Sequence, residues 1–384
     1  MAFRNADIAE AYHRMMYAKE HMRSQEEIIR DLKEVLKTLK EKDFITHIMS
    51  MFLSIGNRDS EMFAHIDSPM RQFAYLIDLY YSIQDRCETE KVTREKWKGI
   101  ALLLEEIEMN NFISIGFSND GDLFHDEKDD KVSVSLQSFI SYFSNASLCY
   151  EEQILERVMR LSPFNELILS EFGFEVEDVY AFVRHMHRLC NSKLTESVYG
   201  QLGDCARYFT DKQEWERLTA VFIKAGIPPD QWILQPELRG MKSYLETPPA
   251  AIVQHTEDEM MAADIPQERL ESIVGFLKYN PYENCGKTVY YADHRLFEDR
   301  PLLQIEGVSV CPHGKFVIEA VHNRLNAYLL ASKKKDKYIA YRSRALECKI
   351  VEIMRGLFGK KAEIYMEYSV DGKCEQDILV GYKG

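Results

Sequence analysis

Apolar residues recur at helical spacing through most of the first 245 residues, and this periodicity restricts that part of the chain to a mainly α-helical fold. Ser24 and Glu27 form a capping-box pattern, and the helix that follows carries apolar residues at positions 28, 32, 35, 36 and 39. Phe44–Leu53 and Met70–Ile83 are richer in apolar residues, which predicts buried helices. We find no convincing repeat of about 30–45 residues, so an irregular helical array stays open beside a single helical domain.

Local signals refine this helical prediction. Asn110–Ser118 alternates apolar and polar residues, which predicts a strand. Ser162-Pro163 is typical of a helix start, with proline at the first helical position. Thr210–Gln213 is typical of a second capping box, and the helix after it is expected to end at Gly226.

The pattern changes after residue 245. Prolines and acidic residues over 246–266 predict a linker. Beyond it, Lys287–Tyr291 and Leu302–Cys311 are rich in β-forming residues, and the second is predicted to be a hairpin with Glu306-Gly307 at its turn. The predicted organisation is mainly α with a C-terminal α/β portion: a helical domain over 1–245, the linker over 246–266, a small α/β connector over 267–330 and a partial α/β core over 331–384.

Composition places the chain among folded proteins without a membrane anchor. Its 384 residues are 46% hydrophobic and 29% charged, which suffices for two or three domains with a sizeable core. The sequence has neither an uncharged apolar run of about 18 residues nor a signal-peptide pattern, so we expect a cytoplasmic protein. Its eight cysteines are scattered without a C-x-x-C pair, which favours free thiols over disulfides or zinc.

The net charge of −14 argues against a protein that coats nucleic acid along its whole surface. One segment, Ser332–Arg344, opposes this trend with six basic residues and one aspartate. It leads directly into the C-terminal helix described next. It is either a solvated linker or a segment that contacts phosphates; its basic residues are Lys333, Lys334, Lys335, Lys337, Arg342 and Arg344.

Arg344–Gly359 is typical of an amphipathic helix that ends on a glycine. Glu347 precedes Ile350 by three positions, so the two side chains lie on one side of the helix. The apolar face predicted to pack on a sheet consists of Ile350, Ile353, Met354, Leu357 and Phe358. Glu352 is expected to point to solvent.

Two strands are predicted to follow this helix. Glu363–Ser369 and Glu375–Val380 flank Val370–Lys373, which has Asp-Gly at the expected hairpin turn. Alternation places Glu375 and Asp377 on one face of the second strand. Carboxylates converging from a helix and a strand suit Mg²⁺, which neutralises phosphate charge and activates water in phosphodiester hydrolysis.

A helix with a leading glutamate, a hairpin and a Glu-x-Asp before aliphatic residues resembles the Mrr-like branches of the PD-(D/E)xK nuclease superfamily, over about residues 296–384. The resemblance implies a restriction-endonuclease-like core. It implies that Glu347 and Asp377 are catalytic ligands of Mg²⁺ or Mn²⁺, and that DNA or RNA is bound through the basic segment. The Glu-x-Lys strand of the family does not follow Asp377, and Lys383 has no glutamate two positions before it. We therefore expect a part of a longer protein, inactive as a nuclease by itself.

Alternatives remain open from the sequence. The chain can instead be a non-enzymatic helical scaffold for protein–protein interaction, with Glu347 and Asp377 merely solvated. His185 and His187 lie two apart on a predicted helix, so they are not expected to share one metal. The acid-rich loop over 119–130 lacks EF-hand spacing, and the sequence contains no recognisable nucleotide-binding loop.

Overall fold

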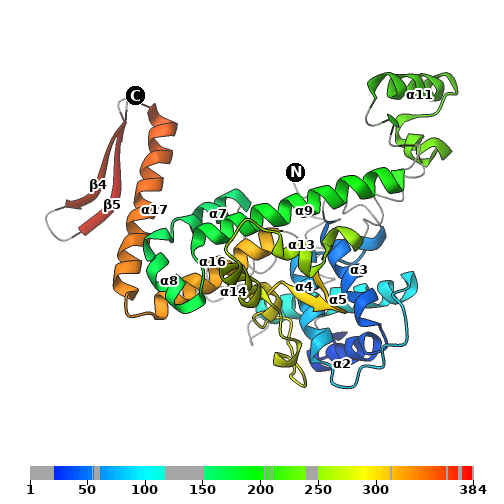
Figure 1. The fold of residues 1–384 in the computed structure, drawn as a ribbon, viewed down its shortest axis with the longest axis horizontal. Coiled ribbons are helices and arrows are strands. Elements are labelled where there is room, and N and C mark those ends of the chain that lie inside the picture. Colours follow the sequence, from blue (N-terminus) through cyan, green and yellow to red (C-terminus); the bar gives the residue numbers. More distant parts are fainter. Residues whose placement is uncertain are drawn as a thin grey trace. The chain divides into compact units, whose positions relative to one another are not determined.

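The computed structural model describes residues 21–53, 55, 61–116, 151–202, 205, 207–208, 211–238, 250–311, 314–359, 362–370, 374–382. These residues are mainly helical, with two small antiparallel sheets (Figure 1). The chain divides into two compact units, the N-terminal unit (Met1–His322) and the C-terminal unit (Asn323–Gly384). Among the described helices, none carries an apolar stretch long enough to cross a bilayer.

The largest hydrophobic core lies among the first helices of the N-terminal unit. Ser24 caps the first of them as predicted: its hydroxyl accepts a hydrogen bond from the Glu27 N–H, and the Glu27 carboxylate accepts one from the Ser24 N–H. Phe52 lies in an aromatic group with Phe73, Phe297 and Phe316. The elements of this region are α2 (Gln25–Leu36), α3 (Glu41–Leu53), η1 (Glu61–Phe63), α4 (Pro69–Ser82) and α5 (Arg94–Gly116).

The strand predicted over 110–118 is wrong for residues 110–116, which continue α5; residues 117 and 118 lie outside the described residues. Both asparagine side chains at the start of this segment have acceptors in the helical structure. The Asn111 amide donates to the Ile107 carbonyl one turn earlier, and the Asn110 amide donates to the Arg23 carbonyl, each at 2.8 Å. Packing of this turn thus overrides the alternating pattern.

The helices of the middle segment begin and end at recognisable signals. Ser162-Pro163 opens a short 3-10 turn, as expected of a helix start. The capping prediction at 210–213 is off by one residue, because the Asp211 carboxylate accepts from the N–H groups of Gln213 and Glu214. Gly226, at φ 72°, follows the end of that helix as predicted. The elements are α7 (Glu151–Met159), η2 (Ser162–Phe164), α8 (Asn165–Phe172), α9 (Val176–Leu202), α11 (Lys212–Lys224), η4 (Pro229–Leu234) and η5 (Pro236–Leu238).

A three-stranded sheet of order β1-β3-β2 lies in the same unit. It contains β1 (Gln254–His255), β2 (Leu303–Ile305) and β3 (Val308–Val310), all antiparallel. The predicted hairpin is confirmed, since Ile305 pairs with Val308 across Glu306-Gly307, both in the left-handed region. The β1 strand comes from a segment that the sequence placed in a linker. Around it, residues 250–261 form η6 (Ala250–Val253) and α13 (Glu257–Met261), the latter opened by a Thr256–Glu259 capping box.

Lys287–Tyr291 forms no strand, contrary to prediction. The buried Arg295 guanidinium donates to the Tyr290 and Tyr291 carbonyls, so these groups are engaged without a strand partner. Nearby, the buried Asp78 carboxylate accepts from the Tyr279 hydroxyl at 2.9 Å and from the first N–H groups of a short helix. The elements of this region are α14 (Gln267–Leu277), η7 (Pro281–Glu283), α15 (Leu296–Asp299) and α16 (Gly314–Ala331).

The C-terminal unit confirms the predicted helix and hairpin. Helix α17 (Lys335–Phe358) is followed by β4 (Ala362–Val370) and β5 (Cys374–Tyr382), which pair antiparallel from Ala362↔Tyr382 to Val370↔Cys374. The helix packs against both strands. It begins nine residues before the predicted start at Arg344, so most of the basic segment is helical.

Candidate functional site

Glu347 lies on the side of α17 that is most buried in its C-terminal half. Val351, one turn later on that side, is only 5% exposed, and the Glu347 side chain is 22% exposed. Arg344 Nη1 donates to Glu347 Oε2 at 3.2 Å within the same helix. Glu347 is therefore a half-buried carboxylate with one cationic neighbour. Glu352 is exposed, as predicted, and pairs with Lys349 at 3.1 Å.

Asp377 lies in β5, between Gln376, which pairs with Tyr368, and Ile378, which pairs with Met366. Its side chain lies outside the described residues. The structure brings together the two elements that carry Glu347 and Asp377, because α17 packs against β5. Among the side chains that are described, no three His, Cys, Asp or Glu residues gather as metal ligands.

The apolar face of α17 differs from the predicted one. Ile353 is 50% exposed and Leu357 72% exposed, so the prediction that both pack on a sheet is wrong for the described residues. The buried ridge instead centres on Val351. A two-stranded hairpin is narrow, and it leaves one side of a 24-residue helix without a described cover.

The basic segment presents its lysines to solvent. Lys333 and Lys334 precede α17, and Lys335 and Lys337 lie in its first turn; all four are exposed. Cations at a helix N-terminus oppose the helix dipole, so helix stability does not explain their position. Arg342 differs, because its guanidinium lies over the Tyr338 ring, 5.9 Å from the centroid, and donates to Asn326 at 3.4 Å.

The two neighbouring histidines of α9 have separate partners. His185 Nε2 lies 2.7 Å from the Glu259 carbonyl oxygen. His187 Nε2 lies 2.6 Å from Glu151 Oε1, and this hydrogen bond raises the pKa of His187. The acid-rich loop over 119–130 lies outside the described residues.

A cysteine and a histidine also meet in this unit, with Cys190 Sγ 3.7 Å from His255 Nε2. Burial raises the pKa of Cys190 to about 11 and lowers the pKa of His255 to about 4. Both groups are therefore neutral near pH 7. A nucleophilic cysteine needs a thiolate, so this pair has the wrong electrostatics for covalent catalysis.

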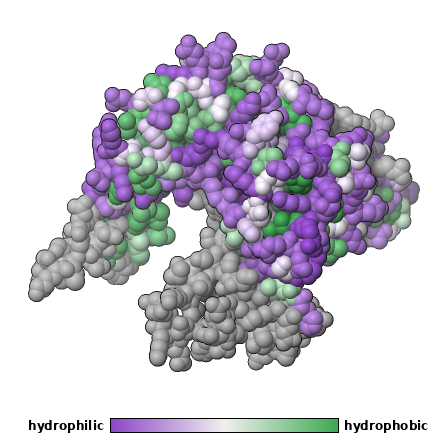
Figure 2. Space-filling model, turned by 90° about the horizontal axis from the view of Figure 1, so that it is seen from below, coloured by the Kyte–Doolittle hydropathy of each residue, from purple (hydrophilic) through white to green (hydrophobic). Residues whose placement is uncertain are grey.

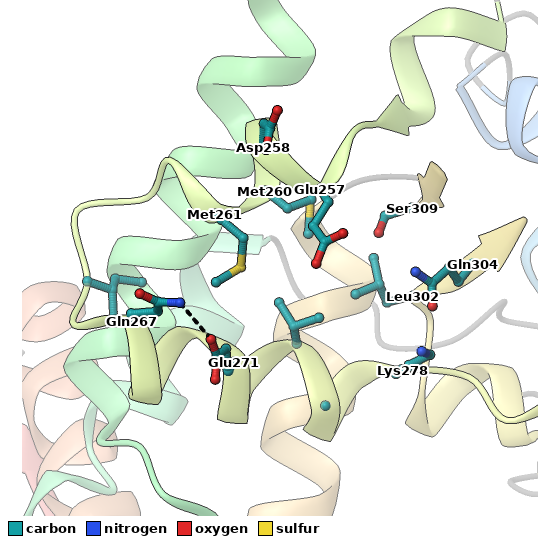
Figure 3. Close-up of a pocket in the computed structure, with 13 residues that line it drawn as sticks. Glu257, Asp258, Met260, Met261, Gln267, Glu271, Lys278, Leu302, Gln304 and Ser309 are labelled. Atoms are coloured by element: carbon teal, nitrogen blue, oxygen red, sulfur yellow. Dashed lines mark hydrogen bonds between the residues drawn. The ribbon is translucent and has the colours of Figure 1, made fainter. Parts of the chain in front are cut away.

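A pocket of about 610 Å³, which the sequence patterns did not predict, lies between α13, α14 and the β2–β3 hairpin (Figure 3). The inner part of the pocket is apolar. Its floor is formed by the buried side chains of Met260 and Leu302, and its walls by the half-buried side chains of Met261, Ile265 and Val274. The volume is within the range of small-molecule sites, about 300–1,000 Å³.

The mouth of the pocket is polar, and acidic side chains outnumber basic ones among its lining residues. In Figure 3, the Glu257 side chain points from α13 toward α14, where Glu271 lies, and Asp258 points away from the space between them. Gln267 Nε2 donates to Glu271 Oε1 at 2.9 Å and fixes that carboxylate. Lys278 is the one cationic side chain among the described lining residues.

Gly275 lies within α14 and lines the pocket. Its φ lies outside the left-handed region, and a Cβ added there meets no described atom within 4 Å. Neither the backbone nor these neighbours require a glycine, although it costs a helix about 0.5–1 kcal/mol relative to alanine. This mid-helix glycine and the acidic start of α13 were the only sequence signals of the pocket.

No protein-family model, no curated protein and no solved structure matches this chain. The candidate functions therefore rest on the residues and geometry described above.

Proposed function

We propose that the C-terminal unit is part of a nuclease-like α/β core that holds Mg²⁺ or Mn²⁺ between Glu347 and Asp377. The observation that carries the proposal is the packing of α17 on both strands of the β4–β5 hairpin, with Glu347 on the buried side of the helix. A glutamate on a helix and an aspartate on a strand that contacts it supply two carboxylates, the ligand type that divalent cations such as Mg²⁺ prefer.

The residues around Glu347 support a role at a phosphate. A bound metal would neutralise phosphate charge and activate water. Arg344 would shield the Glu347 charge before a cation binds, and then become available to a phosphate oxygen. Lys333, Lys334, Lys335 and Lys337 would supply the nonspecific attraction to the DNA or RNA backbone, with Arg342 on the same helix.

A second candidate function is a non-enzymatic interaction scaffold. The exposed apolar residues of α17, Leu346, Ile353, Leu357 and Phe358, favour it, because large exposed apolar side chains on one helix are typical of a contact surface. Figure 2 shows a mainly hydrophilic surface on which hydrophobic residues gather in separate patches. This function needs neither the metal nor the lysines.

Binding measurements on the full chain test the proposal, because they report on the metal site directly and do not require turnover. Calorimetry should detect Mn²⁺ binding that weakens at least about 10–100-fold in Glu347→Gln and in Asp377→Asn. Glu352→Gln removes the same charge from an exposed position of the same helix and should leave the affinity unchanged. Equal Mn²⁺ affinity in all four proteins would exclude the metal site.

Nucleic-acid binding is tested separately with a fluorescent duplex at several salt concentrations. Replacing Lys333, Lys335 and Lys337 with alanine should weaken binding and reduce the salt slope by about 0.9 for each phosphate that is no longer neutralised. Replacing Lys212 and Lys224 of α11 is the control that removes positive charge elsewhere. A chain that binds neither Mn²⁺ nor duplex leaves the scaffold as the better function.

A further inference from the structure

We propose that the pocket between α13, α14 and the β2–β3 hairpin binds a small organic cation, with an apolar body and at least one ammonium group. The site lies entirely in the N-terminal unit and does not depend on the function proposed for the C-terminal unit.

The apolar part of the ligand is indicated by the lining. Met260 and Leu302 are buried at the floor, and Met261 and Val274 lie on the walls. Methionine side chains are flexible and polarisable, so they fit against apolar ligands of varied shape. A floor of this kind rejects a small, fully hydrated ion, because covering its charge with apolar groups is unfavourable.

The cationic part of the ligand is indicated by the two carboxylates at the mouth. Glu257 points from α13 toward α14, where Glu271 is held by Gln267 (Figure 3). An ammonium group between them would donate charge-assisted hydrogen bonds to opposite walls. Lys278 and Gln304 lie at the other end of the pocket, where Lys278 repels a second cation and favours a neutral or acceptor group.

The walls are held in place by contacts that do not use the pocket-facing groups. Glu259 fixes α13 to α9, since its carboxylate pairs with Lys193 at 2.7 Å and its carbonyl contacts His185. Arg269 fixes α14 to the start of α9 through Glu175 at 2.5 Å and Asp178 at 3.1 Å. The space is therefore formed before a ligand enters, and little ordering opposes binding.

The hairpin wall is fixed as well. The Tyr279 N–H donates to the Leu302 carbonyl at 2.8 Å, and the Leu302 N–H donates to the Leu277 carbonyl at 3.1 Å. These bonds tie the end of α14 to the start of β2, on either side of Lys278.

Gly275 leaves the α14 wall of the pocket without a side chain. It lowers the helix stability of α14, and no described neighbour or backbone conformation needs it. A large side chain at position 275 would extend into the pocket, whereas a Cβ there meets no described atom within 4 Å.

The experiment uses three probes that share a six-carbon chain with a hydroxyl at one end and differ in charge at the other: 6-amino-1-hexanol, hexamethylene glycol and 6-hydroxyhexanoate. Calorimetry with the full chain at physiological salt should show saturable binding of one amino alcohol, no binding of the hydroxy acid, and binding of the glycol weaker by about tenfold or more. Failure of the amino alcohol to bind, or equal binding of the amino alcohol and the glycol, overturns the proposal.

Variants place the binding in the pocket. Glu271→Gln and Glu257→Gln should each weaken binding of the amino alcohol by about tenfold, whereas Glu216→Gln, on exposed α11, should not. Gly275→Phe should abolish binding by filling the space, while Gly275→Ala, which raises helix propensity with little volume, should keep most of it. Full affinity for the amino alcohol in folded Gly275→Phe, checked by circular dichroism, would show that the cation binds elsewhere and would refute the site.

Discussion

Apolar residues are buried to different extents in two regions of the molecule: the α2–α5 region of the N-terminal unit and the α17–hairpin region of the C-terminal unit. In the first, Phe52 and Phe73 lie in an aromatic group with rings from distant segments. In the second, Tyr338 and Val351 are the buried residues of α17, and Leu357 remains 72% exposed. The first region is a closed core, and the second is a single layer with one described face covered.

The charged groups follow the same division. The N-terminal unit buries Asp78, Arg295 and Glu108, whereas no charged residue described in Asn323–Gly384 is buried. A buried charge must have its partners built in, because the alternative is a large desolvation cost. Charges on α17 have no such constraint and can respond to a cation or a phosphate. The comparison therefore separates buried charges, whose effect on stability depends on the partners around them, from exposed charges that are open to binding.

The largest expected effect tests the closed core. Asp78→Ala should lower the free energy of unfolding by about 3–5 kcal/mol. The change leaves the Tyr279 hydroxyl and the first N–H groups of α15 without their acceptor. It also leaves the buried Arg295 without a nearby carboxylate. Urea unfolding followed by tryptophan fluorescence measures it, since Trp97, Trp215 and Trp232 all lie in the N-terminal unit.

Asp78→Asn is the control for this prediction. Its side-chain oxygen can still accept hydrogen bonds, so the destabilisation should be smaller than with alanine. An alanine variant as stable as the parent would show that the Asp78 network is not what holds α15 on α4.

The next effect concerns a buried carboxyl group whose partners do not offset its burial. Glu108 is only 3% exposed, and burial raises its pKa to about 7 from a usual value of 4.5. A raised carboxyl pKa in the folded state means that stability is fully present below pH 4.5 and is lost as pH rises through 7. The decrease is up to about 3 kcal/mol, from about 1.4 kcal/mol per pH unit.

Glu108→Gln is neutral at every pH and should therefore stabilise the protein by about 1–3 kcal/mol at pH 8, with little effect near pH 4.5. Unfolding in urea at both pH values gives the comparison. Glu352→Gln on exposed α17 should show no such difference. If Glu108→Gln is destabilising at pH 8, the carboxylate has a partner that its ionised form needs.

Short-range patterns were sufficient for much of this fold. The Ser24–Glu27 capping box, the Glu306-Gly307 turn and the β4–β5 hairpin are all confirmed, because each depends on residues a few positions apart. The strand predicted at residue 110 failed for the opposite reason. The Asn110 partner, the Arg23 carbonyl, lies 87 residues away, and no local pattern reports it.

The candidate sites were harder to predict from the sequence than the secondary structure. The sequence placed Glu347 on the side of Ile350 and Leu357, but the buried residue one turn after Glu347 is Val351, and Leu357 is exposed. The periodicity of α17 cannot tell which apolar side is covered when the sheet has only two strands. The pocket was missed because its floor and mouth come from α13, α14 and β2, and residues 250–261 looked like a linker.

The smallest expected effect examines the uncovered side of α17. Leu357→Gln should change stability by less than about 0.5 kcal/mol, as for an exposed site. Val351→Ala should cost about 0.5–2 kcal/mol, because it removes two methyl groups from a buried position. Hydrogen–deuterium exchange of peptides from α17 measures both, and exchange should rise only in the second variant. If Leu357→Gln opens the helix as much as Val351→Ala does, the apolar side of α17 is covered, and the contrast between the closed core and the open layer fails.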